Sequence, residues 1–137
     1  MAVLLDTGFV YAVINRTERQ HEAATKVARE IREPMLLPTP VIVEVAFLLL
    51  RDIGPLAVAD FVGDLATTDM ILVDPQVTDY QRAAAVLRQY NDAHIDLVDA
   101  LIVAMAERMN VQLILTLDQR HFCMFRPKHR VAFDLLA

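Results

Sequence analysis

The sequence predicts an α/β fold: a three-layer α/β/α domain with a mainly parallel central sheet of four to five strands. Short, continuously apolar runs alternate with longer segments of helical periodicity, as in parallel strands that helices connect and cover. The 137 residues are enough for one sizeable core, and 55% of them are hydrophobic. No repeat, low-complexity tract or linker divides the chain, so we expect a single domain over residues 1–137.

The predicted strands are apolar runs of three to five residues, the pattern of strands buried on both faces. A Thr-Gly pair follows the first run, and turn residues bound most of the others. The runs lie at residues 2–5, 35–37, 71–73 and 111–115, with a fifth strand expected at 130–133.

The predicted helices carry apolar residues at steps of three and four. In the fifth of them, for example, Val77, Tyr80, Ala84 and Leu87 fall on one face. Pro40 favours a helix start, and Gly54-Pro55 favours a helix end. The expected helices are a stretch ending at Ile14, then residues 18–32, 39–52, 55–66, 76–92, 96–109 and 119–122.

Composition excludes several classes of protein. The net charge of −5 gives no overall cationic field for binding a polyanion. The single cysteine, Cys123, excludes an intramolecular disulfide and a cysteine-based zinc cluster. The N-terminus lacks the basic region of a signal peptide, and acids interrupt apolar runs that are about half a membrane span long. We therefore expect a cytoplasmic protein with no membrane contact.

Four acidic residues stand in unusual positions. Asp6 ends the first predicted strand and Asp118 follows the fourth, so both should lie at the carboxyl edge of the sheet, where α/β proteins bind ligands. Glu44 and Asp99 interrupt apolar helices. A carboxylate taken out of water without a partner is destabilising by several kcal/mol.

Each acid also has a purely structural explanation. Asp96 and Asp99 match the N-cap and third position of a helix, where together they stabilise the helix start by about 1 kcal/mol. Asp6 suits a turn, Asp118 suits a helix cap, and Glu44 suits an ion pair with an arginine. Taken together, however, acids gathered at one edge repel one another unless a cation joins them. Oxygen-only ligands favour Mg²⁺ or Mn²⁺.

The segments that contain these acids resemble the PIN domain, and in particular the VapC-type toxins of toxin–antitoxin pairs. The resemblance covers essentially the whole chain, and the order Asp, Glu, Asp, Asp is its most specific part. The matching segments are LLDTGF, VIVEVAFLLL, VDALIVAMAE and LILTLDQRHF.

The resemblance implies a Mg²⁺- or Mn²⁺-dependent endoribonuclease whose catalytic and metal-binding residues are Asp6, Glu44, Asp99 and Asp118. Asp96 occupies a position that varies in the family, and Thr7 and Thr116 match hydroxyl positions beside the first and last acids. The resemblance further implies an RNA substrate, a homodimer and a VapB-type antitoxin as partner. The apolar helices at 39–52 and 55–66 are the expected contact surface.

Because the overall charge is negative, contacts to RNA phosphates must be local. Arg16 and Arg19, after the first helix, and Arg120, beside Asp118, are the candidates. The ordinary alternative for each is a solvated surface charge. The sequence names neither the RNA nor the number of metal ions.

Three other functions fit parts of the sequence. Asp6-Thr7-Gly8 matches aspartic proteases, but these are all-β proteins rich in glycine, and this chain has three glycines. An aspartyl-nucleophile phosphatase needs a second acid at position 8, which is Gly8. The remaining alternative is a non-catalytic PIN-like interaction module whose acidic pocket binds arginines of a partner.

Overall fold

The computed structural model describes residues 1–128 and 134–136, with the side chains of 119–121 and 134–136 left out of the description. Its centre is a five-stranded sheet in the order β3-β2-β1-β4-β5. Every neighbouring pair is parallel. The predicted three-layer fold is therefore confirmed, with five strands. The strands are β1 (Val3–Leu5), β2 (Met35–Pro38), β3 (Ile71–Val73), β4 (Leu113–Leu115) and β5 (Asp134–Leu136).

The central strand β1 is the best buried, because helices cover both of its faces. Its three side chains are at most 1% exposed, which explains why its sequence is continuously apolar rather than alternating. Leu5 pairs with Leu115 of β4. Asp6 and Thr116, the next residues in each strand direction, therefore emerge side by side at the carboxyl edge.

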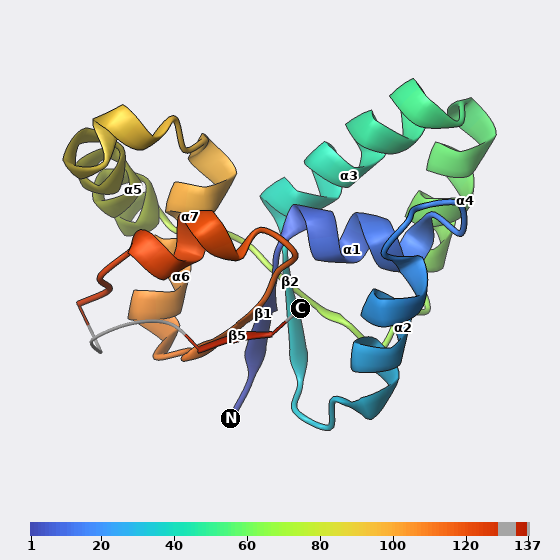
Figure 1. The fold of residues 1–137 in the computed structure, drawn as a ribbon, viewed down its shortest axis with the longest axis horizontal. Helices are drawn as coiled ribbons and strands as arrows, with labels where there is room; N and C mark the ends of the chain where they lie inside the picture. Colours follow the sequence, from blue (N-terminus) through green and yellow to red (C-terminus); the bar gives the residue numbers. More distant parts are fainter. Residues whose placement is uncertain (129–133, 137) are drawn as a thin grey trace.

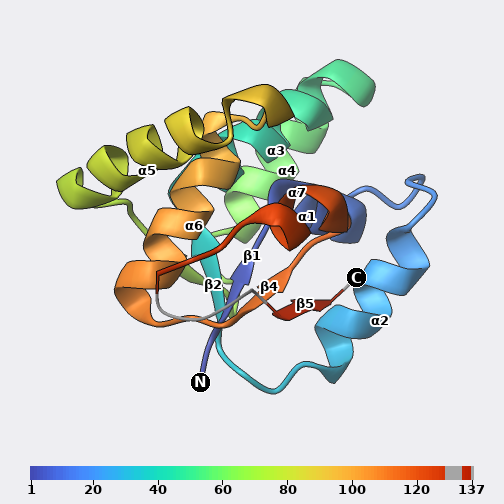
Figure 2. The ribbon, with the colours of Figure 1, turned by 60° about the vertical axis from the view of Figure 1, so that its left-hand side comes forward.

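Helices flank the sheet on both sides (Figures 1 and 2). The helices α1 and α2 lie on one side, α5 and α6 lie on the other, and α3 rises from the end of β2 to reach α4. The helices are α1 (Thr7–Ile14), α2 (His21–Glu30), α3 (Thr39–Asp52), α4 (Pro55–Asp64), α5 (Val77–Gln89), α6 (Leu97–Met109) and α7 (Gln119–Met124).

The bounds of several predicted elements differ from those in the structure by one to three residues. The second helix begins at His21 rather than residue 18, because the side chain of Asn15 accepts hydrogen bonds from the amide and hydroxyl of Thr17 and holds a turn there. The fifth strand was expected at 130–133, but residues 129–133 lie outside the described part of the chain. The strand that the structure does describe, β5, begins at Asp134.

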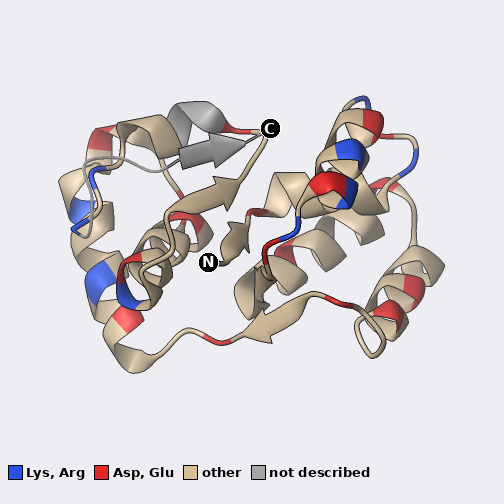
Figure 3. Ribbon diagram, turned by 90° about the horizontal axis from the view of Figure 1, so that it is seen from below, with Lys and Arg blue, Asp and Glu red and all other residues tan. Residues whose placement is uncertain are grey.

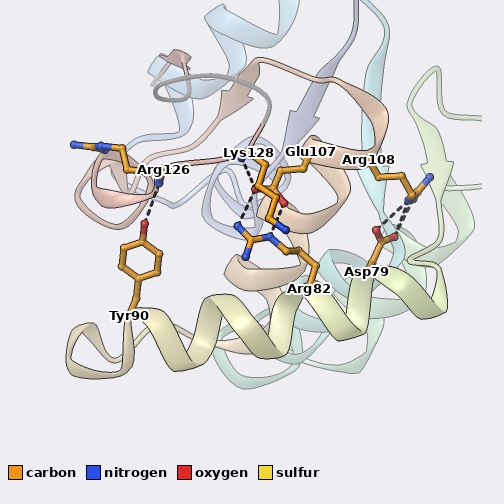
Figure 4. Close-up of polar contacts among 7 residues, drawn as sticks. All are labelled: Asp79, Arg82, Tyr90, Glu107, Arg108, Arg126 and Lys128. Carbon is orange, nitrogen blue, oxygen red and sulfur yellow. Dashed lines mark hydrogen bonds and ion pairs between the residues drawn. The ribbon is translucent and has the colours of Figure 1, made fainter.

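Helix α6 is buried nearly all round, as its sequence predicts. It is covered on one side by α5, and polar contacts tie these two helices to the segment after α7 (Figure 4). Arg82 on α5 pairs with Glu107 on α6 at 2.7 Å, and Arg108 on α6 pairs with Asp79 on α5 at 2.9 Å. Glu107 also accepts a hydrogen bond from the amide of Lys128. We call these four charged residues of α5 and α6 the α5–α6 clasp.

Within the described residues, every helix is too short or too polar to cross a lipid bilayer.

Candidate active site

A single pocket of about 910 Å³ opens at the carboxyl edge of the sheet, where acids from separate segments meet. Figure 3 shows Lys and Arg mainly on the outer helices, while acidic segments also reach the middle of the molecule. Six carboxylates line this cavity, and one of them, Glu18, belongs to the loop between α1 and α2. We call the other five, together with the cavity itself, the acid pocket. They are Asp6, Glu44, Asp96, Asp99 and Asp118. Of the lining side chains in the described part of the chain, none is basic.

Asp6 and Asp118 are held together by Thr116. The Thr116 hydroxyl donates to Oδ2 of Asp6 at 2.7 Å and accepts from the amide of Asp118 at 3.0 Å. The other oxygen of Asp6 accepts from the amide of Thr7 at 2.8 Å and so caps α1. Thr116 is fully buried and Asp6 is 6% exposed, so parallel pairing of β1 with β4 fixes this part of the pocket.

Thr7 connects the start of α1 to Glu44 on α3. Its hydroxyl donates to Oε1 of Glu44 at 2.5 Å, which is a charge-assisted distance. The sequence left open an ion pair between Glu44 and an arginine. The contact that the structure gives Glu44 is instead this hydroxyl.

Asp96 and Asp99 lie at the start of helix α6. Asp96 has both of the roles that the sequence suggested: it caps the helix and it belongs to the group of acids. Its Oδ1 accepts from the amide of Asp99 at 2.9 Å, so Asp96 is the N-cap. Asp96 and Asp99 also line the acid pocket. The cap fixes the first turn of α6 and thereby the place of Asp99.

Crowding and partial burial of carboxylates make their ionised forms costly. Burial raises the pKa of Asp99 to about 8, and the four neighbouring acids add to the shift. Burial also raises the pKa of Asp6 to about 6, although the hydrogen bond from Thr116 opposes the shift. Burial raises the pKa of Glu44, while Thr7 again acts in the opposite direction. Desolvation by burial is the largest cause of each pKa shift, and the like charges that face the same cavity add to it.

The chemistry of the donor set fits a hard divalent cation. All six charged side chains that line the cavity present oxygens, and each carboxylate oxygen keeps a lone pair beyond its hydrogen bond to the protein. Among the described residues, no three acidic, histidine or cysteine side chains already form a metal cage.

The arginines predicted to contact RNA phosphates are not among the described residues that line the pocket. Arg16 and Arg19 are exposed in the loop between α1 and α2, and the pocket is instead lined there by Glu18 and Gln20. Arg120 lies on α7, but its side chain is outside the described part. All three roles stay predictions.

Sequence reasoning missed several residues on the less polar side of the pocket. Phe47 and Leu48 lie three and four residues after Glu44, and Tyr11 lies four after Thr7. Helical spacing puts such residues on the same face as the acid or hydroxyl, so this signal was present. Nothing in the sequence indicated the loop residues Glu18 and Gln20.

The structure therefore belongs to the class of parallel α/β domains that have an acidic pocket at the carboxyl edge of the sheet. The family model of the PIN domain matches residues 3–125. The chain therefore belongs to the PIN domain family, which confirms the family predicted from its four acidic segments.

Individual proteins are similar to this chain in sequence or in fold. The chain is 27% identical over 125 residues to Ribonuclease VapC26 of Mycobacterium tuberculosis, covering 91% of this chain and 93% of the relative. The crystal structure of Mycobacterium tuberculosis VapC20, described as a Sarcin-Ricin loop cleaving toxin, superposes with a TM-score of 0.76 at 20% identity, over 82% of this chain and 86% of that one. VapBC2 from Rickettsia felis, bound to a DNA fragment from its promoter, gives a TM-score of 0.72 at 13% identity over 100% of both chains.

Proposed function

We propose that this protein is a divalent-metal-dependent endoribonuclease and the toxin of a VapBC-type toxin–antitoxin pair. The observation that carries the proposal is the meeting of Asp6, Glu44, Asp99 and Asp118 in one pocket, from four segments far apart in sequence. Membership of the PIN family and the likeness to a protein named Ribonuclease VapC26 support the same reading.

We assign Mg²⁺ or Mn²⁺ to these four carboxylates. When bound, the ion would activate water and stabilise the charge that develops on the scissile phosphate. Thr116 and Thr7 hold Asp6 and Glu44 by hydrogen bonds, so two of the four acids are oriented before substrate arrives. Asp118 and Glu44 are the candidates to accept the proton of the attacking water. No side-chain nucleophile is needed for this chemistry.

We further propose that exposed apolar side chains on α3 and α4 are covered in the assembled toxin by a second copy or by an antitoxin. Solvent reaches more than half of the surface of each, which is unusual for a contiguous group of large apolar residues. They include Val43, Leu50, Ile53, Leu56 and Val62.

The decisive test is Asp99→Asn, assayed on total RNA with Mn²⁺. Loss of one charged ligand should reduce cleavage at least about 1,000-fold, comparable to removal of a group that stabilises the transition state. Calorimetry should show weakened Mn²⁺ binding, and circular dichroism should show an intact fold.

Asp92→Asn is the matched control, because Asp92 is exposed and outside the acid pocket. It should cleave RNA like the unsubstituted protein. Undiminished cleavage by Asp99→Asn would remove this residue from the site. An unsubstituted protein that neither binds Mn²⁺ nor cleaves RNA would favour the non-catalytic interaction module.

A further inference from the structure

Phe47 is an aromatic residue that the core of the protein does not use. It lies on α3 between the buried side chains of Val45 and Leu49, which are at most 1% exposed, while Phe47 itself is 62% exposed. An exposed aromatic ring beside a catalytic pocket suggests a ligand that covers it.

Helix geometry brings the ring to the acid pocket. Phe47 follows Glu44 by three residues, so the two side chains lie on one face about 5–6 Å apart at their Cβ atoms. Both line the cavity, and so do Leu48 and Tyr11. The pocket thus has an acidic side and an aromatic and apolar side.

Tyr11 behaves differently from Phe47 and is part of the pocket wall. It is only 8% exposed. Its hydroxyl donates to Asp52 at 2.5 Å and accepts from the side-chain amide of Asn15 at 2.9 Å. Phe47 has no polar atom to fix it, so its ring remains available to an incoming group.

We infer that Phe47 is a stacking platform for a nucleobase next to the scissile phosphate, an inference that rests on the proposed ribonuclease function. The cavity, at about 910 Å³, is far larger than a metal site needs and falls in the range of organic ligands. If a divalent ion bound to the acids holds the scissile phosphate, the neighbouring base would come within reach of the apolar side of the cavity. Stacking accepts every base, since each has a π face.

Charge explains why stacking matters here. The protein carries a net charge of −5, and the described side chains that line the pocket include no lysine or arginine. Affinity for the substrate within the pocket must then come in part from contacts other than ion pairs. Stacking provides such affinity, and, unlike phosphate contacts, it does not release counterions.

The test is Phe47→Leu, which keeps apolar surface but removes the ring. We expect about a tenfold rise in KM for a single-stranded RNA, equivalent to about 1.4 kcal/mol, with kcat unchanged. Anisotropy with a fluorescent oligonucleotide in Ca²⁺ should show the same loss of affinity, with the salt dependence of binding unaltered. Phe47→Trp should restore affinity.

Oligonucleotides that each lack one base around the cleavage position locate the stacked base. The unsubstituted protein should lose about tenfold in affinity when that base is missing, and Phe47→Leu should lose nothing more. Tyr80→Leu is the matched control, because Tyr80 is an aromatic residue that is 50% exposed on α5 and does not line the pocket. Its RNA affinity should stay unchanged.

Several outcomes overturn the inference. Equal RNA affinity of Phe47→Leu and the unsubstituted protein excludes stacking, and so do additive losses with the abasic oligonucleotides. Altered self-association with unaltered RNA binding assigns Phe47 to a protein interface instead. If the unsubstituted protein neither binds nor cleaves RNA, the proposed function fails together with this inference, whereas cleavage insensitive to Phe47 defeats the inference alone.

Discussion

The acid pocket and the α5–α6 clasp contain the same kind of side chain in opposite electrostatic settings (Figure 4). In the clasp, each carboxylate faces an arginine. Asp79 is 2% exposed and paired with Arg108, and Glu107 is 9% exposed and paired with Arg82. In the pocket, carboxylates face one another across a cavity. Burial alone therefore does not decide what an acid does.

The pKa values separate the two regions. Burial tends to raise the pKa of Glu107, but hydrogen bonds from Arg82 and the Lys128 amide outweigh it and lower the pKa. In the pocket, burial and neighbouring acids act together, and the pKa of Asp99 rises to about 8. The clasp stabilises the fold through its charges, whereas the pocket keeps charges together at some cost in stability, as functional sites often do.

Replacing one acid in each region should produce the largest difference in stability between the two variants. Asp79→Asn leaves Arg108 without its partner and weakens the capping box of α5, in which Asp79 accepts from the amide of Gln76. We expect about 3 kcal/mol lower stability. Asp99→Asn relieves repulsion in the metal-free protein and should leave stability equal or higher. Urea unfolding in EDTA measures both.

The electrostatic difference between the two regions would be contradicted if Asp79→Asn were as stable as the unsubstituted protein, or if Asp99→Asn were less stable than it. Cleavage per folded molecule is the second measurement. It should be retained in Asp79→Asn and lost in Asp99→Asn.

A smaller effect is expected from Thr116→Val, which keeps the shape of the side chain but removes its hydroxyl. Asp6 then loses the 2.7 Å hydrogen bond that orients it. In other metal sites, loss of a contact that orients a metal ligand reduces metal affinity or activity by roughly 10–100-fold. We expect a reduction of the same size here. Mn²⁺ titration calorimetry measures the affinity.

Thr25→Val is the matched control for this substitution. The Thr25 hydroxyl is buried and has no hydrogen-bond partner among the described residues, so its removal should leave Mn²⁺ affinity unchanged and stability equal or higher. Equal Mn²⁺ affinities of Thr116→Val and Thr25→Val would show that the hydroxyl of Thr116 does not support the site.

Stability should also depend on pH, with opposite sign in the two regions. The carboxyl of Asp99 titrates at about 8 when folded against 3.8 ordinarily, so the folded state holds more protons than the unfolded state in this window. Stability of the metal-free protein should therefore fall as pH rises from 3.8 to about 8, with Asp6 contributing up to about 6. The groups facing Asp99 are Asp6, Glu44, Asp96 and Asp118.

Glu107 acts in the other direction, because its pKa is lowered from 4.5. Its contribution is present above 4.5 and disappears as pH falls through its folded pKa. Melting temperatures measured in EDTA between about pH 4 and about pH 9 should decline for the unsubstituted protein as the pH rises. The decline should be shallower in Asp99→Asn, and an identical decline would exclude Asp99 as its source.

Local sequence was sufficient for most of the elements. Strand β1 was predictable because a strand buried on both faces must be apolar throughout, and α6 was predictable because a helix surrounded by protein has no polar face. The start of α2 was harder to predict from the sequence, because it depends on the turn that the side chain of Asn15 holds. The acids were identifiable because Glu44 and Asp99 interrupt apolar helices, which is costly without a functional or structural partner.

By itself, therefore, the sequence determined the strands, the helices, the edge of the sheet where Asp6 and Asp118 lie, and the family. Those features follow from local periodicity and from the energetic cost of buried charge. Only the tertiary structure decided which groups meet: Thr116 with Asp6 across 110 residues, and Thr7 with Glu44 across 37. Contacts between distant segments depend on strand order and helix orientation, and no local pattern of residues encodes these.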